Sequence, residues 1–219
     1  MDRSGCRAVL WDLDGVLADT GELHYRAWQE ACDEAGIPFD RDLFARTFGR
    51  NNAGALEVVL GHVPEEGFLR RFVERKEGLF RARAAGTVRP IPGVEGWLRA
   101  FRDRGLKQAV ASSGPPENLE AVLGSLGFLP YFDVVVSGAE LPGKPEPHVF
   151  LRAAELLGVP PASCLVVEDA VVGVRAARAA GMKVLAVATT HPAEALAEAD
   201  RVLPGFEEGP DFVEFLRIP

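Results

Sequence analysis

The stretch Ala8–Thr20, AVLWDLDGVLADT, decides the fold of this 219-residue chain. It begins with four apolar residues, Ala8-Val-Leu-Trp11, and continues with two aspartates, Asp12 and Asp14. A run this apolar, bounded by Gly15, predicts a strand buried on both faces. The two aspartates then lie at the carboxyl end of a buried strand, which is where open α/β sheets bind their ligands.

The two aspartates would point to the same side if the strand continued past Trp11. Two carboxylates forced together repel, so one of them is protonated or a cation lies between them. Gly15 allows the backbone to turn sharply straight afterwards. A plain strand end followed by an Asp-Gly turn explains the same residues, so the rest of the chain has to decide.

The composition narrows the class of protein. The hydrophobic content of 47% is enough for a proper core, and the length suits one large domain or one domain with an insert. A net charge of -8 argues against binding to nucleic acid or to an anionic membrane surface. Cys6, Cys32 and Cys164 form no close pair, which indicates a reducing compartment. With no long apolar run, we expect a soluble, cytoplasmic protein that is a monomer or a weak dimer.

Apolar periodicity and glycine or proline breaks divide the chain into helices and strands. Helices are predicted over Gly21–Ala35, Asp40–Phe48, Ala53–Leu60, Glu65–Ala85, Val94–Arg104, Glu117–Leu126, His148–Leu157 and Ala170–Ala180. Later strands are predicted over Leu106–Ser112, Asp133–Ser137, Cys164–Glu168, Lys183–Val187 and Arg201–Leu203. The tail Asp211–Pro219 fits a final helix.

The order of these elements predicts the fold class. Strands alternate with helices from residue 89 onward, which indicates βαβ units with right-handed crossovers and a parallel sheet. The stretch before that contains helices and no convincing strand. We therefore expect a doubly wound, Rossmann-like α/β core formed by residues 1–18 and 89–219, with a helical cap inserted as residues 19–88. A helical unit placed directly after the first strand can close over the site like a lid.

Polar residues follow three of the later strands. Ser112-Ser113, Lys144 and Glu168-Asp169 each lie at or near a predicted carboxyl end. Taken singly, these are an ordinary loop, a solvated lysine and a helix N-cap. Because the carboxyl ends of parallel strands share one edge, all three can converge on Asp12 and Asp14.

These residues carry a resemblance. DLDGVLADT, VASSG, GKPEPHVF and VVEDAVVGVRAARAAGM are similar to the four motifs of the haloacid-dehalogenase-like hydrolase superfamily. The helical insert resembles its α-helical cap, and the chain is most similar to the β-phosphoglucomutase-like and phosphoglycolate-phosphatase-like subgroup. The resemblance covers nearly the whole chain.

The resemblance implies a role for each conserved motif residue of the core. Asp12 would attack phosphorus and form an aspartyl-phosphate. Asp14 would protonate the leaving oxygen and then take a proton from the attacking water, so it acts as acid and base. Ser112 and Lys144 would bind the oxygens of the transferring phosphoryl group. Dehalogenases of the same fold lack the second aspartate, so Asp14 favours phosphoryl transfer.

The resemblance also implies a Mg²⁺ ion. An anionic nucleophile and a phosphate dianion repel, and a divalent cation between them removes that repulsion. Asp12, the backbone carbonyl of Asp14 and the Asp169 carboxylate would hold the ion, with Glu168 behind them or as an alternate ligand. Mg²⁺ prefers such oxygen ligands.

The cap decides between a phosphatase and a mutase. His24 corresponds to a histidine that couples cap closure to the acid/base in β-phosphoglucomutases. Those enzymes also hold the second phosphate with a lysine and an arginine, and here these positions fall on Phe48 and Asn52. Arg50 is a possible substitute. We therefore expect His24, Arg50 and Ser113 to contact the substrate.

Three functions remain open at this point. The first is a Mg²⁺-dependent phosphatase acting on a small phosphorylated metabolite, of the sugar phosphate or phosphoglycolate type. The second is a β-phosphoglucomutase-type isomerase. The third is a non-catalytic module that binds a ligand on the same fold.

Overall fold

The structure is a computed structural model that describes residues 5–207 and 209. Within these residues, a six-stranded parallel sheet has the strand order β5-β4-β1-β6-β7-β8. The strands are β1 (Ala8–Trp11), β4 (Lys107–Ser112), β5 (Val134–Ser137), β6 (Cys164–Glu168), β7 (Lys183–Val187) and β8 (Arg201–Leu203). The doubly wound α/β fold predicted from the sequence is confirmed, and β1 ends one residue before Asp12.

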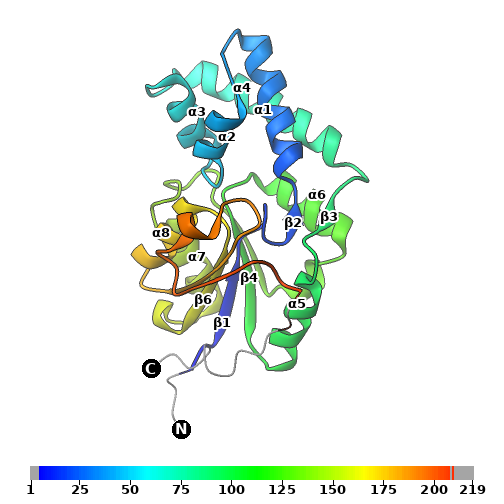
Figure 1. Cartoon of the computed structure of the whole chain (residues 1–219), viewed down its shortest axis with the longest axis vertical. Coiled ribbons are helices and arrows are strands. Elements are labelled where there is room, and N and C mark those ends of the chain that lie inside the picture. The colour runs from blue at the N-terminus through cyan, green and yellow to red at the C-terminus, as the bar shows by residue number, and fades with distance from the viewer. Residues whose placement is uncertain (1–4, 208, 210–219) are drawn as a thin grey trace.

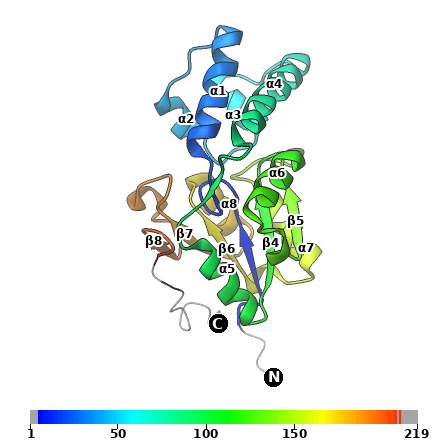
Figure 2. The ribbon, with the colours of Figure 1, turned by 90° about the vertical axis from the view of Figure 1, so that its right-hand side faces the viewer.

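Helices cover both faces of the sheet, as Figure 2 shows. Helices α5 (Val94–Asp103) and α6 (Pro116–Leu126) pack on one face, and α7 (His148–Leu157) and α8 (Val171–Ala179) pack on the other. Alternate residues of β1 supply the two interfaces: Trp11 joins the first cluster and Leu10 joins the second. This explains why the strand reads as a continuous apolar run.

An aromatic cluster ties β1 to the last part of the described chain. The Trp11 ring lies 5.7 Å from the Phe101 ring and 6.1 Å from the Phe206 ring, measured between centroids. Trp97 packs edge-on against Phe206 and donates its indole N–H to the Phe206 carbonyl at 3.0 Å. All four side chains are buried, so they form one end of the core.

The first four helices form a separate group beyond the carboxyl edge of the sheet (Figure 1). They are α1 (Gly21–Ala35), α2 (Arg41–Thr47), α3 (Asn52–Leu60) and α4 (Glu66–Ala84). Trp28 of α1 packs against Phe72 of α4, with the ring centroids 5.4 Å apart. The four helices predicted for this group are therefore present, and each helix end lies within one residue of its predicted position.

Two short strands connect this helical group to the sheet, and the sequence did not predict them. β2 (Ala18–Asp19) and β3 (Arg89–Pro90) pair antiparallel, with Ala18 opposite Pro90 and Asp19 opposite Arg89. Strands of two residues are too short to show a periodic pattern. They hold the two connectors of the helical group side by side.

The tail Asp211–Pro219, where the sequence fits a helix, lies outside the described residues. In the part of the chain that the structure describes, no helix combines the length and the apolar character that crossing a membrane requires.

Candidate active site

The carboxyl edge of the sheet brings Asp12, Lys144 and Glu168 together. Asp12 follows β1, Lys144 lies in the loop after β5, and Glu168 ends β6. The Lys144 ammonium donates to Asp12 Oδ1 and to Glu168 Oε1, both at 2.6 Å. All three side chains are buried, so the lysine forms an ion pair with two carboxylates inside the protein.

Burial and charge shift the protonation of this cluster. Burial raises the pKa of Asp12 to about 7; Lys144 opposes this change, while Glu168 and Asp14 add to it. Burial also works against the charged form of Lys144, but Asp12 and Glu168 outweigh it and raise the pKa of the ammonium above its usual value. The lysine therefore stays charged, and Asp12 needs further positive charge nearby to stay ionised at neutral pH.

Asp169 has a carboxylate oxygen that is left unpaired in the described part of the chain. It is 1% exposed, and its Oδ2 has no hydrogen-bond partner among the described residues. Burial raises the pKa of Asp169 well above its usual value, and the charges of Glu168 and Asp12 add to this. A Cβ on Gly15, whose φ is +83°, would lie 2.0 Å from this oxygen. The turn after Asp14 can therefore pass against the Asp169 carboxylate only because it has a glycine.

The donor set fits a cation that takes oxygen ligands. No group of three or more His, Cys, Asp or Glu side chains in the described chain is arranged as a metal site on its own. The expected ligands, however, include only two such side chains, Asp12 and Asp169, with a backbone carbonyl as the third. Glu168 is already occupied: its Oε1 accepts from Lys144, and its Oε2 accepts from the backbone N–H groups of Asp169 and Ala170 at 2.8 Å. A divalent ion would give the unpaired oxygen of Asp169 a partner. It would also reduce the repulsion between Asp169 and Asp12, whose pKa is raised as well.

Asp14 is bonded to the helical group rather than to the lysine. Its Oδ1 accepts from the Thr20 hydroxyl at 2.6 Å and lies 3.1 Å from His24 Nε2 on α1. Burial would raise the pKa of Asp14, but the charge and hydrogen bond of His24, with the Thr20 bond, lower it. The His24 ring stacks on Phe80 of α4, with the centroids 3.9 Å apart, and this fixes its orientation. His24 thus contacts the predicted acid/base from the cap.

Further buried polar residues lie on the side of His24 away from Asp14, and they were not predicted from the sequence. Lys76 Nζ lies 3.2 Å from His24 Nδ1 and 2.9 Å from Glu77 Oε1. Asn52 and Asn118 also donate to the Glu77 carboxylate, at 2.8 and 2.6 Å. The sequence offered one sign of them, the neighbouring Lys76 and Glu77 in a helix of mixed polarity. Such a pair usually lies on a solvent-exposed face, so it did not indicate a buried site.

The two predicted serines have different surroundings. Ser112 is buried at the end of β4, and its hydroxyl oxygen accepts from the Gly114 N–H at 3.1 Å. Ser113 donates its hydroxyl to the carbonyl of Gly49, between α2 and α3, at 2.9 Å. Ser113 therefore links the core to the cap.

The loop between α2 and α3 makes a second contact with the core. Asn51 Nδ2 donates to the Leu141 carbonyl at 3.1 Å, while its Oδ1 accepts from Gly54 N–H and caps α3. Beside it, Arg50 is half-buried, and its Nε has no partner in the described chain. These contacts hold the cap against the sheet edge.

A pocket lies between the cap and the sheet edge and contains most of the predicted site residues. Side chains of the core and of α1 to α4 line it together: Asp12, Asp14, Ser112, Ser113, His24, Trp28, Phe48, Arg50, Asn52, Lys76 and Glu77. Lys144, Glu168 and Asp169 lie beneath it in the core. The residues predicted from separate strand ends are thus brought to one edge of the sheet.

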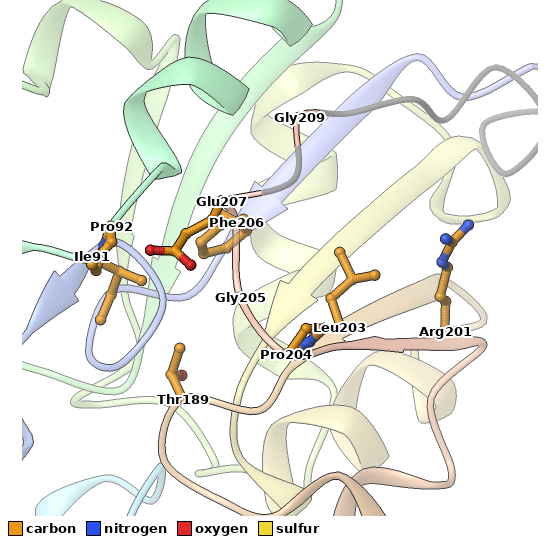
Figure 3. A pocket seen from close by; sticks show the side chains of 10 residues that line it. All are labelled: Ile91, Pro92, Thr189, Arg201, Leu203, Pro204, Gly205, Phe206, Glu207 and Gly209. Carbon is orange, nitrogen blue, oxygen red and sulfur yellow. The ribbon is translucent and has the colours of Figure 1, made fainter.

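A separate cavity of about 380 Å³ lies on the far side of the connectors, between Ile91 and Pro92 after β3 and the segment around Phe206 (Figure 3). Thr189 and Glu207 also line it. It holds none of the predicted site residues, so it is not the candidate active site.

Comparisons with known proteins agree with this geometry. A family model described as haloacid dehalogenase-like hydrolase matches residues 6–181. The chain is 33% identical over 195 residues to a β-phosphoglucomutase of Bacillus subtilis, covering 85% of each chain. It is 32% identical over 202 residues to a phosphorylated carbohydrates phosphatase of Thermotoga maritima, covering 89% of this chain and 92% of that one.

A solved structure is also similar over nearly the full length. CbbY from Rhodobacter sphaeroides, in complex with xylulose-(1,5)bisphosphate, has a TM-score of 0.82 and 29% identity, covering 93% of this chain and 96% of that one. The family match spans the first strand, the cap and the residues that end β4 and β6. The chain therefore belongs to the haloacid dehalogenase-like hydrolase family.

Proposed function

We propose that this protein is a Mg²⁺-dependent phosphatase that hydrolyses a small phosphorylated metabolite through an aspartyl-phosphate on Asp12. The observation that carries the proposal is the buried cluster in which Lys144 joins Asp12 to Glu168, directly beneath a pocket closed by the cap. Relatives named as phosphatases of phosphorylated carbohydrates and of fructose 1-phosphate support the substrate class.

The reaction follows from the positions of the side chains. An oxygen of the Asp12 carboxylate forms a bond to phosphorus as the ester oxygen leaves. Asp14, which must take up a proton before this step, donates it to the leaving oxygen. Asp14 then accepts a proton from water, which attacks phosphorus and releases inorganic phosphate and the free carboxylate. Lys144 and the Ser112 hydroxyl stabilise the negative charge on the phosphoryl oxygens during both steps.

A divalent cation completes the charge balance. Asp12, Asp169 and the backbone carbonyl of Asp14 would hold Mg²⁺, which would offset the repulsion between the nucleophile and the phosphate. Glu168 then acts by positioning Lys144, because both of its oxygens already accept hydrogen bonds.

The helical group would act as the cap of this active site, with its limits at residues 19 and 88. Its His24 contacts Asp14, so the acid/base is fully bonded only when the cap lies against the core. Closure of this kind excludes bulk water from the phosphoryl group.

The cap favours a phosphatase over a mutase. Phe48 and Asn52 stand where a mutase of this family has a lysine and an arginine, and the Asn52 amide is engaged by Glu77. Arg50 is then left as a cap cation with an unpaired Nε in the described chain. Lys76, another cap cation of the pocket, is paired with Glu77, so a bisphosphate intermediate is held weakly and water becomes the acceptor of the phosphoryl group.

Inorganic phosphate released from a panel of phosphate esters tests the proposal, with Mg²⁺ and with EDTA. We expect release that EDTA and the near-isosteric Asp12→Asn variant both reduce to background. No release from any ester in the presence of Mg²⁺ would contradict the assignment.

The mutase alternative is favoured by His24 and by the β-phosphoglucomutase relative. It predicts conversion of β-glucose 1-phosphate to glucose 6-phosphate without net release of phosphate. That result would replace the phosphatase by an isomerase on the same residues.

The state of the cysteines supports a proposal about the cellular compartment. Cys6, Cys32 and Cys164 are free, and burial raises the pKa of each, to about 11, 12 and 12. Unpaired and unreactive thiols suit a reducing compartment, so we place the protein in the cytoplasm as a monomer or weak dimer.

A further inference from the structure

The pocket contains a buried carboxylate that the proposed mechanism does not use. Glu77 lies on α4, is 4% exposed, and lines the pocket together with Asp12. It stands at the end of a chain of polar contacts that runs from Asp14 through His24 and Lys76. Its place in the pocket wall puts it where the non-reacting part of a substrate would lie.

Glu77 is both charged and fixed. Its Oε1 accepts from Lys76 at 2.9 Å and from Asn52 at 2.8 Å, and its Oε2 accepts from Asn118 of α6 at 2.6 Å. Burial would raise the pKa of Glu77, but the charges of Lys76 and His24 and these hydrogen bonds lower it. A carboxylate bonded to donors from two cap helices and from the core cannot turn away from a ligand.

Of the cationic side chains with which the cap lines the pocket, Lys76 already has an anionic partner. Lys76 forms a buried ion pair with Glu77, so its ammonium is already engaged by a carboxylate and is a poor site for a second anion. Arg50 is the pocket cation whose Nε lacks a partner in the described part of the chain. The phosphoryl group of a monoester carries close to two negative charges and draws on Arg50 and Lys144. A second anionic group on the substrate would then lie near the Glu77 carboxylate, with Lys76 already paired and Arg50 drawn to the phosphoryl group.

We propose that Glu77 determines specificity: it favours phosphate esters of neutral, hydroxyl-bearing compounds and disfavours esters that carry a carboxylate or a second phosphate. This inference rests on the proposed phosphatase function and narrows its substrate class. Hydroxyl groups donate to carboxylate oxygens, which suits a sugar or polyol. Trp28, buried in the same pocket, offers an apolar ring to the carbon skeleton.

The experiment compares pairs of related phosphate esters in which one member carries an additional anionic group. Glycerol 3-phosphate is paired with 3-phosphoglycerate, and fructose 1-phosphate with fructose 1,6-bisphosphate, and kcat/KM is measured for each. We expect the full chain to favour the neutral member of each pair by about tenfold or more, the size of effect expected for a like charge near a buried carboxylate. Glu77→Gln should reduce that preference about tenfold, because the repulsion is lost and Lys76 becomes unpaired.

Glu74→Gln is the matched control, because Glu74 is exposed on the same helix and should leave the preference unchanged. A variant that only loosens the cap would lower kcat/KM for both members of a pair and keep their ratio, which would overturn the inference. Equal turnover of neutral and acidic esters by the unmodified chain would also overturn it, whether or not Glu77→Gln folds. Failure to hydrolyse any ester, p-nitrophenyl phosphate included, would instead remove the phosphatase assignment itself.

Discussion

Lys144 is the residue that holds the core of the site together. Its ammonium is 2.6 Å from both Asp12 and Glu168, and none of the three is open to solvent. Replacing all members of a buried ion pair by apolar residues costs a protein little stability. Removing a single member, however, leaves a charge unpaired inside the protein. Stability and the proposed chemistry would therefore depend on the same side chain.

We predict that Lys144→Met lowers the free energy of unfolding by about 3–5 kcal/mol, because two carboxylates lose their common partner. Urea unfolding followed by circular dichroism measures this. Arg152→Met is the control, since Arg152 forms an exposed pair with Glu155 and its loss should cost at most about 1 kcal/mol. An unchanged unfolding midpoint for Lys144→Met would mean that the buried cluster is not held as described.

The carboxyls of Asp12 and Asp169 predict a link between pH, metal and stability. The pKa of Asp12 rises from 3.8 to about 7 in the folded protein, so the folded chain holds a proton that the unfolded chain loses. The stability of the metal-free protein should therefore fall as the pH rises between these values. Mg²⁺ should raise the melting temperature clearly at pH 8 and little at pH 5.

Asp169→Asn tests this link. The variant should melt higher than the unmodified chain at pH 8 without metal, because one repelling charge is gone, and it should respond less to Mg²⁺. Asp103→Asn, on the exposed end of α5, should change neither quantity. An equal Mg²⁺ response in both variants would argue against Asp169 as a ligand.

The sequence predicted the site residues of the core, and His24 and Arg50 of the cap, but it missed Lys76 and Glu77 for a physical reason. Asp12, Lys144 and Asp169 follow strands, and a parallel sheet brings strand ends to one edge whatever the details of packing. Lys76 and Glu77 sit on a helix, where the direction of a side chain depends on how the helix is rotated against its neighbours. The local sequence does not determine this rotation. The sequence therefore gave no reason to expect that Lys76 and Glu77 are buried rather than exposed to solvent.

At the scale of the elements, the loop between α2 and α3 is one of the contacts between cap and core, through Ser113 and Asn51. Gly49 has φ of +84°, and a Cβ there would lie 2.7 Å from the Ala170 Cβ at the start of α8. The loop can approach the core this closely only with a glycine at this position.

We predict that Gly49→Ala lowers kcat/KM about tenfold by keeping the cap away from the core. Gly61→Ala is the matched control: Gly61 ends α3 with φ of +75°, and its Cβ would meet nothing within 4 Å. Gly61→Ala should lose about 1 kcal/mol of stability from backbone strain, and Gly49→Ala should lose more because its Cβ also meets Ala170, but only Gly49→Ala should lose activity. Equal activities for the two variants would show that this contact does not limit the reaction.

The helices and strands themselves were largely predictable. The predicted ranges His148–Leu157, Cys164–Glu168 and Lys183–Val187 match the structure to the residue, because apolar runs and glycine ends mark them. The short strands β2 and β3 were missed, since two residues carry no period and their pairing joins positions about seventy residues apart.

At the scale of the whole molecule, Phe206 connects the two ends of the described chain. Its ring contacts Trp11 and Trp97, and its carbonyl accepts a hydrogen bond from Trp97. These rings belong to the hydrophobic cluster that β1 shares with α5, and all of them are buried.

We predict that Phe206→Ala lowers the free energy of unfolding by about 3–5 kcal/mol through the cavity it leaves in the core. Denaturant unfolding measures the loss, and folded protein should keep its turnover. Leu129→Ala, at a side chain that is 44% exposed, should change stability by no more than about 0.5 kcal/mol. A small effect at Phe206 would mean that the last described segment packs only loosely.

The pairing of β2 with β3 has a consequence for how such a molecule can diversify. Because the helical group begins and ends at the paired strands β2 and β3, its exchange for another insert of different length need not move a strand of the six-stranded sheet. New substrates can then be acquired by grafting or redesigning the insert alone, while the phosphate chemistry below it is inherited unchanged.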